Sequence, residues 1–113
     1  MDCLFCKIMA GEIPSQKVYE DEDTYAFKDI NPQAPVHVLV ISKEHTPDLS
    51  HADALTDHQL AACLRTCAKV VDQLGIAEKG YRVVNNCGEH GCQSVKHIHF
   101  HVLGGEQLGE HMA

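Results

Sequence analysis

Three histidines alternate with apolar residues near the end of this chain, in the run His-Ile-His-Phe-His-Val-Leu over residues 97–103. Side chains of a strand alternate between its two faces, so this run predicts a half-buried strand with His97, His99 and His101 on one face. The apolar residues between them fall on the other face, where they can pack into a core. Imidazoles titrate near neutral pH and can bind a metal, transfer protons or act as nucleophiles. We therefore expect this strand to carry the function.

The rest of the chain predicts an α+β fold with a five-stranded antiparallel sheet and two helices. Apolar runs bounded by turn residues indicate four further strands. They are expected at residues 16–20, 24–28, 36–42 and 81–85. One helix is expected over residues 3–10, capped by Asp2, and a second between the capping box Thr56-x-x-Gln59 and Gly75. This order of elements is typical of an antiparallel sheet with helices packed on it.

Length and charge exclude several classes of function. A chain of 113 residues fits one domain, residues 1–113, whose small core would gain from dimerisation. An apolar stripe on the second helix, Leu60, Leu64, Cys67 and Val71, also favours a homodimer, because one small sheet leaves part of it uncovered. The formal charge of −7 argues against a nucleic-acid polymer as partner, but not against a mononucleotide. No apolar run has transmembrane length and no signal-like N-terminus is present, so we expect no membrane partner and a cytoplasmic location.

The alternating run resembles the signature of the histidine triad (HIT) family, His-φ-His-φ-His-φ-φ, where φ is apolar. The resemblance extends to the family's D-I-x-P-x-A-P-x-H segment at residues 28–37, its phosphate loop at residues 80–86 and 91–94, and its N-terminal helix and turn at Phe5 and residues 11–14. The match is closest to the Hint branch, whose members are homodimeric nucleoside phosphoramidases. It implies a HIT-like fold in which the sheet extends across a homodimer.

The resemblance also implies roles in hydrolysis of the P–N bond of a purine nucleoside 5′-phosphoramidate, without an organic cofactor. His99 would be the nucleophile and form a nucleotidyl-histidine intermediate. His101 would contact the phosphoryl oxygens or the leaving group, while His97 and His37 would orient the triad. Asp29 would accept hydrogen bonds from the ribose hydroxyls. The phosphate would contact Asn86, Gln93 and Ser94. The base would lie in an apolar slot formed by Leu4, Phe5, Ile8, Phe27 and Ile30.

Cys3 and Cys6 form a Cys-x-x-Cys motif, for which the residues alone leave open two thiols without a role, a redox pair or a zinc site. A redox pair is disfavoured because no strand precedes the motif in a βαβ unit. Some bacterial HIT proteins combine such a motif with a histidine after the central strand and the first triad histidine to bind zinc. By that resemblance, a structural zinc would be bound by Cys3, Cys6, His45 and His97. A Cys₄ set that includes Cys87 and Cys92 is an alternative.

Two departures from the family pattern leave the leaving amine open. Cys92 stands where the family usually has glycine, and residues 106–113 lack the Trp-Pro-Pro ending of many relatives. Two other functions also remain open: a nucleotide-binding regulatory module with little catalysis, and a zinc hydrolase that uses all three histidines of the strand as ligands. The second has no Asp or Glu in the strand to act as a base.

Overall fold

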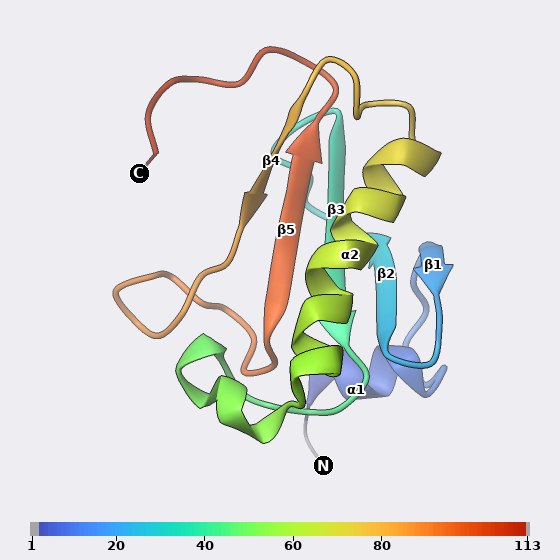
Figure 1. The fold of residues 1–113 in the computed structure, drawn as a ribbon, viewed down its shortest axis with the longest axis vertical. Helices are drawn as coiled ribbons and strands as arrows, with labels where there is room; N and C mark the ends of the chain where they lie inside the picture. Colours follow the sequence, from blue (N-terminus) through green and yellow to red (C-terminus); the bar gives the residue numbers. More distant parts are fainter. Residues whose placement is uncertain (1–2, 113) are drawn as a thin grey trace.

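A computed structural model describes residues 3–112, so the expected cap Asp2 lies outside the described residues. The fold is a five-stranded antiparallel sheet in the order β1-β2-β3-β5-β4, with α2 across one face (Figure 1). The predicted α+β class and strand number are thereby confirmed. The elements are α1 (Leu4–Met9), β1 (Lys17–Glu20), β2 (Thr24–Lys28), β3 (Val36–Ser42), the 3₁₀ helix η1 (Leu49–Ala54), α2 (Asp57–Gln73), β4 (Tyr81–Val84) and β5 (His99–Gly104).

The last strand begins two residues later than the alternation predicts. β5 starts at His99, because the two preceding backbone N–H groups bond to loop carbonyls: His97 N to Val95 O at 2.9 Å and Ile98 N to Thr46 O at 2.8 Å. The side chains nevertheless alternate as expected. Ile98 is fully buried in the core beneath α2, although it lies outside the strand.

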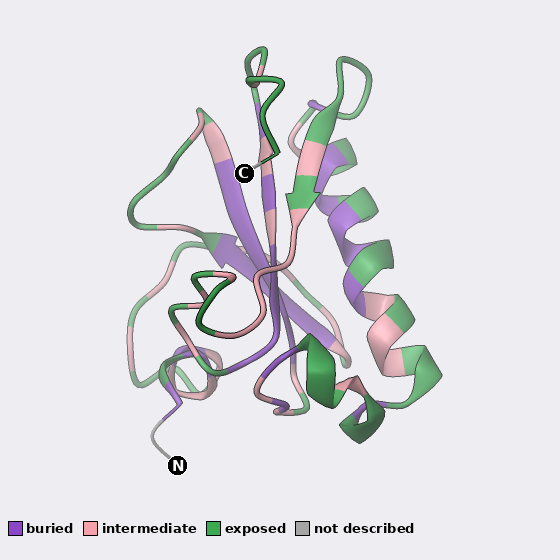
Figure 2. Ribbon diagram, turned by 90° about the vertical axis from the view of Figure 1, so that its left-hand side faces the viewer, coloured by how far each residue is buried: buried purple, intermediate pink, exposed green. Residues whose placement is uncertain are grey.

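The sheet separates two apolar clusters. Figure 2 shows α2 along one side of the sheet, with buried positions of the strands and of α2 in purple. The cluster under α2 contains Ala26, Val38, Val40, Cys63, Cys67, Val70, Val71, Ile98, Phe100 and Val102. The cluster on the opposite face, which includes residues of α1, contains Cys3, Phe5, Ile8, Tyr25, Phe27, Leu39 and Ile41. Because α1 is only six residues long, its stability depends on this packing and on its cap rather than on helix propensity.

The second helix begins and ends as the sequence predicts. Thr56 and Gln59 form a reciprocal capping box, and Gly75 follows the helix with a φ of 74°. The apolar stripe is mostly covered within the chain, since Cys67 and Val71 are buried while Leu64 is 55% exposed. The expectation that part of the stripe stays uncovered is therefore confirmed at Leu64, and Leu60 is only partly buried. No helix among residues 3–112 is long and apolar enough to cross a membrane.

Candidate active site and metal centre

The histidines gather on the sheet face opposite α2, because β3 and β5 are paired in a single register. Leu39 lies opposite His101, Ile41 opposite His99, and His37 opposite Leu103. Directly paired residues point to the same face, so the imidazole of β3 and those of β5 are neighbours. The ring centroids of His37 and His101 are 5.1 Å apart, as are those of His99 and His101.

The tautomer of His99 is set by a backbone carbonyl. Its Nδ1 lies 2.7 Å from the carbonyl oxygen of His97, which can only accept a hydrogen bond. Nδ1 therefore carries the proton, and in the neutral ring Nε2 keeps its lone pair. The edge of Phe5 contacts this ring, with centroids 5.1 Å apart and planes at 86°. His99 is thus held in one orientation as a neutral base or nucleophile.

A chain of hydrogen bonds sets the other two rings. The backbone N–H of Gln33 donates to His37 Nδ1 at 3.0 Å, so the proton of neutral His37 lies on Nε2. His37 Nε2 then donates to His101 Nδ1 at 2.9 Å, which leaves the proton of neutral His101 on its own Nε2. The Asp29 carboxylate lies 3.5 Å from His37 Nε2 and accepts from the backbone N–H of Asn31 at 2.8 Å. His101 is thereby a hydrogen-bond donor beside the lone pair of His99.

Burial keeps these rings neutral. It lowers the pKa of His37 and His99 below the ordinary 6.5, and the nearby Asp29 carboxylate opposes the shift in both. It lowers the pKa of His101 to about 4, with further lowering from the charges that His99 and His37 would carry. Charged imidazoles are disfavoured because desolvation and like charges both penalise them. The neutral tautomers described above therefore prevail at neutral pH.

The expected phosphate loop is built around the side chain of Gln93. Its Oε1 accepts from Gly88 N at 2.9 Å, and its Nε2 donates to Pro47 O at 2.6 Å and Val95 O at 2.9 Å. These bonds engage both ends of the amide, so the structure places the Gln93 side chain in the loop scaffold rather than against a ligand. Ser94 is exposed and Asn86 half-buried.

Cys92 has a φ of 59°, the only positive φ of a residue other than glycine within residues 3–112. A side chain in this left-handed region costs roughly 1–2 kcal/mol, which explains why glycine suits the position. The loop also requires Gly91 for close approach, since a Cβ there would lie 2.6 Å from the Cys87 carbonyl oxygen. Cys92 itself is exposed, and the Cys87 thiol lies 3.4 Å from the Ser50 hydroxyl.

The five residues expected to form a base slot divide into a buried and an exposed set. Phe5, Ile8 and Phe27 lie in the cluster beside the histidines, with Phe5 edge-on to Phe27 at 5.5 Å. Ile30 is 90% exposed and Leu4 is 43% exposed. The exposed pair is therefore not part of the core.

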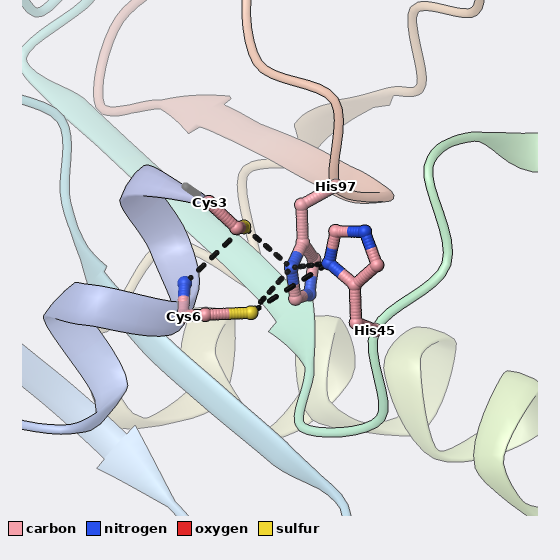
Figure 3. A group of neighbouring side chains, drawn as sticks. All are labelled: Cys3, Cys6, His45 and His97. Atoms are coloured by element: carbon pink, nitrogen blue, oxygen red, sulfur yellow. Dashed lines mark hydrogen bonds between the residues drawn. The ribbon is translucent and has the colours of Figure 1, made fainter. Parts of the chain in front are cut away.

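The four expected metal ligands come together at the start of α1 (Figure 3). Cys3 is the N-cap of α1, and its Sγ accepts from the backbone N–H of Cys6 at 3.3 Å, so it takes the capping position expected for Asp2. His97 Nδ1 lies 3.3 Å from Cys3 Sγ, 3.7 Å from Cys6 Sγ and 3.1 Å from His45 Nδ1. Cys6 Sγ lies 3.6 Å from His45 Nδ1.

These distances are the edges of a coordination tetrahedron. Bond lengths of about 2.3 Å to sulfur and 2.0–2.1 Å to nitrogen give tetrahedral edges of about 3.3 Å between nitrogens and 3.5 Å between nitrogen and sulfur. The His97 ring donates from Nε2 to the Ser42 carbonyl oxygen at 2.7 Å, so its neutral Nδ1 presents a lone pair to the other three atoms. Burial lowers the pKa of His97 to about 4, which keeps that lone pair free. A single cation can be bound by all four of these sulfur and nitrogen atoms at once, whereas one hydrogen atom cannot bridge all four.

The other metal alternatives do not fit this geometry. His97 faces the Cys3 and Cys6 thiols, His99 donates to the His97 carbonyl, and His101 accepts from His37. The three triad imidazoles therefore do not converge on one ion. Cys87 and Cys92 lie outside the group formed by Cys3 and Cys6. Asp29, His37 and His101 are close enough to form a second group. A metal there would have to displace the His37 Nε2 proton that the Gln33 N–H fixes, so hydrogen bonding explains this group better.

Two groups that set the site have no signal in the sequence. The Ser42 carbonyl orients His97, and the backbone N–H of Gln33 orients His37. Backbone atoms are the same at every residue, so only the tertiary structure identifies them.

A family model described as the HIT domain matches residues 10–108. The chain belongs to the HIT family, as the resemblance predicts, and it is an enzyme of the HIT type. It is 44% identical over 112 residues to the purine nucleoside phosphoramidase of Escherichia coli K12, covering 99% of this chain and 94% of that protein. It is 51% identical over 106 residues to the 14 kDa zinc-binding protein of Zea mays, covering 93% and 83%. The structure of a HIT family hydrolase from Clostridium thermocellum has a TM-score of 0.92 and 45% identity, covering 99% and 97% of the two chains.

Proposed function

We propose that this enzyme hydrolyses the P–N bond of purine nucleoside 5′-phosphoramidates through a nucleotidyl-histidine intermediate on His99. The observation that carries the proposal is the pair of complementary tautomers: a neutral His99 with its lone pair on Nε2 beside a His101 that donates from Nε2. The similarity to a purine nucleoside phosphoramidase supports the choice of substrate class.

The proposed reaction has two steps. His99 Nε2 attacks the α-phosphorus, the P–N bond breaks, and the leaving nitrogen takes a proton from solvent and departs as the amine, while His101 donates a hydrogen bond to the phosphoryl oxygen or the leaving nitrogen. Backbone N–H groups of the loop at residues 86–94, together with Asn86 and Ser94, would stabilise the charge that develops on phosphorus oxygens. Water then attacks phosphorus and the P–Nε2 bond breaks, which releases the nucleoside monophosphate, returns a proton to solvent and restores neutral His99.

The test is turnover of adenosine 5′-phosphoramidate, followed by intact-protein mass after a rapid quench that avoids acid. We expect AMP as product and a transient adduct of one adenylyl group per chain. Tight AMP binding without turnover would favour the alternative of a regulatory nucleotide-binding module.

The ribose and base contacts are also proposed. Asp29 accepts a hydrogen bond from the Asn31 N–H and lies 3.5 Å from His37 Nε2, so its carboxylate keeps acceptor capacity, and its side chain is 18% exposed. The base would pack on the Phe5–Phe27 pair, with Leu4 and Ile30 as exposed apolar side chains available to cover it.

Asp29→Asn is expected to weaken binding of AMP by roughly tenfold, since hydrogen bonds to a charged acceptor are worth about 1.5–3 kcal/mol. Binding of the 2′,3′-dideoxy analogue should change much less, because that ligand offers no ribose hydroxyl to the carboxylate. Titration calorimetry with both ligands measures the difference. Equal losses for the two ligands would remove Asp29 from ribose recognition and leave it as a partner of His37 only.

We further propose that the Cys3, Cys6, His45 and His97 group holds one structural zinc ion. All four ligands come from the chain, as in closed structural sites, and the similarity to a plant zinc-binding protein supports the choice of metal. A bound zinc would link α1 to the segment before β5 and supply structural stability.

A homodimer with a continuous sheet is proposed as well. β4 is an edge strand, and its side chains Tyr81 and Val83 are 42% and 37% exposed. Leu64 of α2 is a further exposed apolar side chain. An open edge with apolar side chains favours pairing with a second strand. We expect sedimentation at micromolar concentration to give a dimer, and a monomer alone would contradict the proposal.

A further inference from the structure

Asn85 is the first residue after β4 and takes no part in the roles described so far. Its Nδ2 donates to the carbonyl oxygen of His99 at 2.9 Å. A carbonyl only accepts, so this bond fixes which end of the amide faces His99. The other end, Oδ1, is buried and has no hydrogen-bond partner among residues 3–112.

The Asn85 side-chain amide carries a free-energy cost at this position. Leaving a buried acceptor without a partner costs about 1–3 kcal/mol, and an apolar side chain at the same place would avoid that cost. The bond to His99 is the compensating interaction that the structure offers.

The bond lies where the strand ladder ends. Pairing between β4 and β5 stops at Val84 opposite His101, so His99 lies beyond the last paired residue of β4. The side chain of Asn85 supplies a donor to His99 on that unpaired stretch. It also immediately precedes Asn86, the first of the three residues expected to contact the phosphate. One residue therefore connects the backbone of His99 to the loop at residues 86–94.

Three contacts then fix His99. Asn85 holds its carbonyl at 2.9 Å, the His97 carbonyl holds its Nδ1 at 2.7 Å, and Phe5 packs edge-on against its ring. The His97 carbonyl and Phe5 orient the ring, whereas only the bond from Asn85 links His99 to the loop. In-line attack requires the nucleophile within about 3–3.5 Å of phosphorus, and a displacement of about 1 Å can cost ~10²-fold in rate.

We propose that Asn85 is a positioning residue whose side-chain amide fixes His99 relative to the phosphate loop. The proposal rests on the proposed role of His99 as nucleophile. Asn85 is expected to act on kcat with little effect on nucleotide affinity, because it touches neither the ribose nor the base residues.

The experiment compares three variants with the parent protein. Asn85→Asp is nearly isosteric and replaces the donor with an acceptor that repels the His99 carbonyl. Asn85→Val removes the donor and the unpartnered acceptor together, so it keeps the fold even where the aspartate does not. Gln73→Glu is the matched control, since Gln73 also donates an amide N–H to a backbone carbonyl, Val18 O at 2.9 Å, but on the exposed side of α2.

Turnover of adenosine 5′-phosphoramidate and the ¹⁵N signals of the His99 imidazole without substrate are the two measurements. We expect kcat to fall roughly 10–100-fold in both Asn85 variants. KM should stay within about threefold of the parent, and Gln73→Glu should keep the parent kcat. The His99 signals should shift or broaden in the Asn85 variants alone, as the ring loses its single orientation.

A kcat within about twofold of the parent in both Asn85 variants would overturn the proposal, and so would equal losses in Gln73→Glu. If the parent itself shows no turnover, the proposed function fails, and the imidazole signals decide the positioning role separately. Unchanged signals would then overturn it, and altered signals in the Asn85 variants alone would uphold it.

Discussion

Replacing His99 by alanine is expected to lower kcat for adenosine 5′-phosphoramidate by at least ~10³-fold, which is about 4 kcal/mol of barrier. The physical reason is that His99 donates from Nδ1 to the His97 carbonyl and so keeps a fixed lone pair on Nε2 for attack, whereas the Nδ1 lone pairs of His97 and His101 face the Cys3–Cys6 group and His37. Steady-state kinetics gives the loss, and intact-protein mass should show that the adenylyl adduct disappears. AMP binding, measured by calorimetry, should survive because ribose and base contacts lie elsewhere.

His58→Ala is the matched control for this experiment. His58 is an exposed histidine on α2, hydrogen-bonded to Asp23 at 2.8 Å and remote from the triad in the fold. Its removal should leave kcat unchanged. Near-normal turnover in His99→Ala would contradict both the nucleophile and the two-step mechanism.

The role of His99 as nucleophile also predicts how turnover depends on pH. Attack needs neutral His99, and burial lowers its pKa below 6.5, so the neutral form persists into mildly acidic solution. His101, whose pKa is lowered to about 4, also stays neutral there. Turnover should therefore hold down to pH ~6.5 and fall as the pH drops through the lowered pKa values. A loss of activity already above that pH would show that a group other than these histidines limits the rate.

Cys3→Ser is expected to lower zinc content and thermal stability together. A metal present at ~100 times its dissociation constant stabilises the folded state by about 2.7 kcal/mol. For a domain of this size that corresponds to roughly 10–20 °C in Tm. The reason is that the four donors converge in the folded chain but not in the unfolded one, so metal binding is coupled to folding. Metal analysis and thermal unfolding measure the two effects.

A strong chelator should reduce the Tm of the parent protein to that of Cys3→Ser and leave that variant unchanged. Cys92→Ser serves as the control, because Cys92 is exposed and lies outside the four-ligand group. Purified protein without zinc, and without a gain in Tm when zinc is added, would refute the structural site. Chelated protein that stays folded yet loses all turnover would instead favour the zinc-hydrolase alternative.

The histidine strand shows how much of the site a local pattern predicts. Alternation places Ile98, Phe100 and Val102 under α2 and the imidazoles on the other face, because the pleat of a strand repeats every two residues. The capping box at Thr56 and the glycine after α2 are equally local signals, and the structure confirms both. The start of β5 at His99 is not local, since it depends on a hydrogen bond from Ile98 to the distant Thr46.

The sequence by itself determined the strand periods, the limits of α2 and the kinds of chemical group available, because these depend on residue type and spacing. Tertiary structure decided what those groups do. It joined Cys3 to His97 across 94 positions, committed Gln93 to the loop scaffold, and left Ile30 on the surface. It also set the tautomers, through the carbonyls of Ser42 and His97 and the N–H of Gln33. Backbone groups are identical along the chain, so only their position in the folded protein gives each histidine its role.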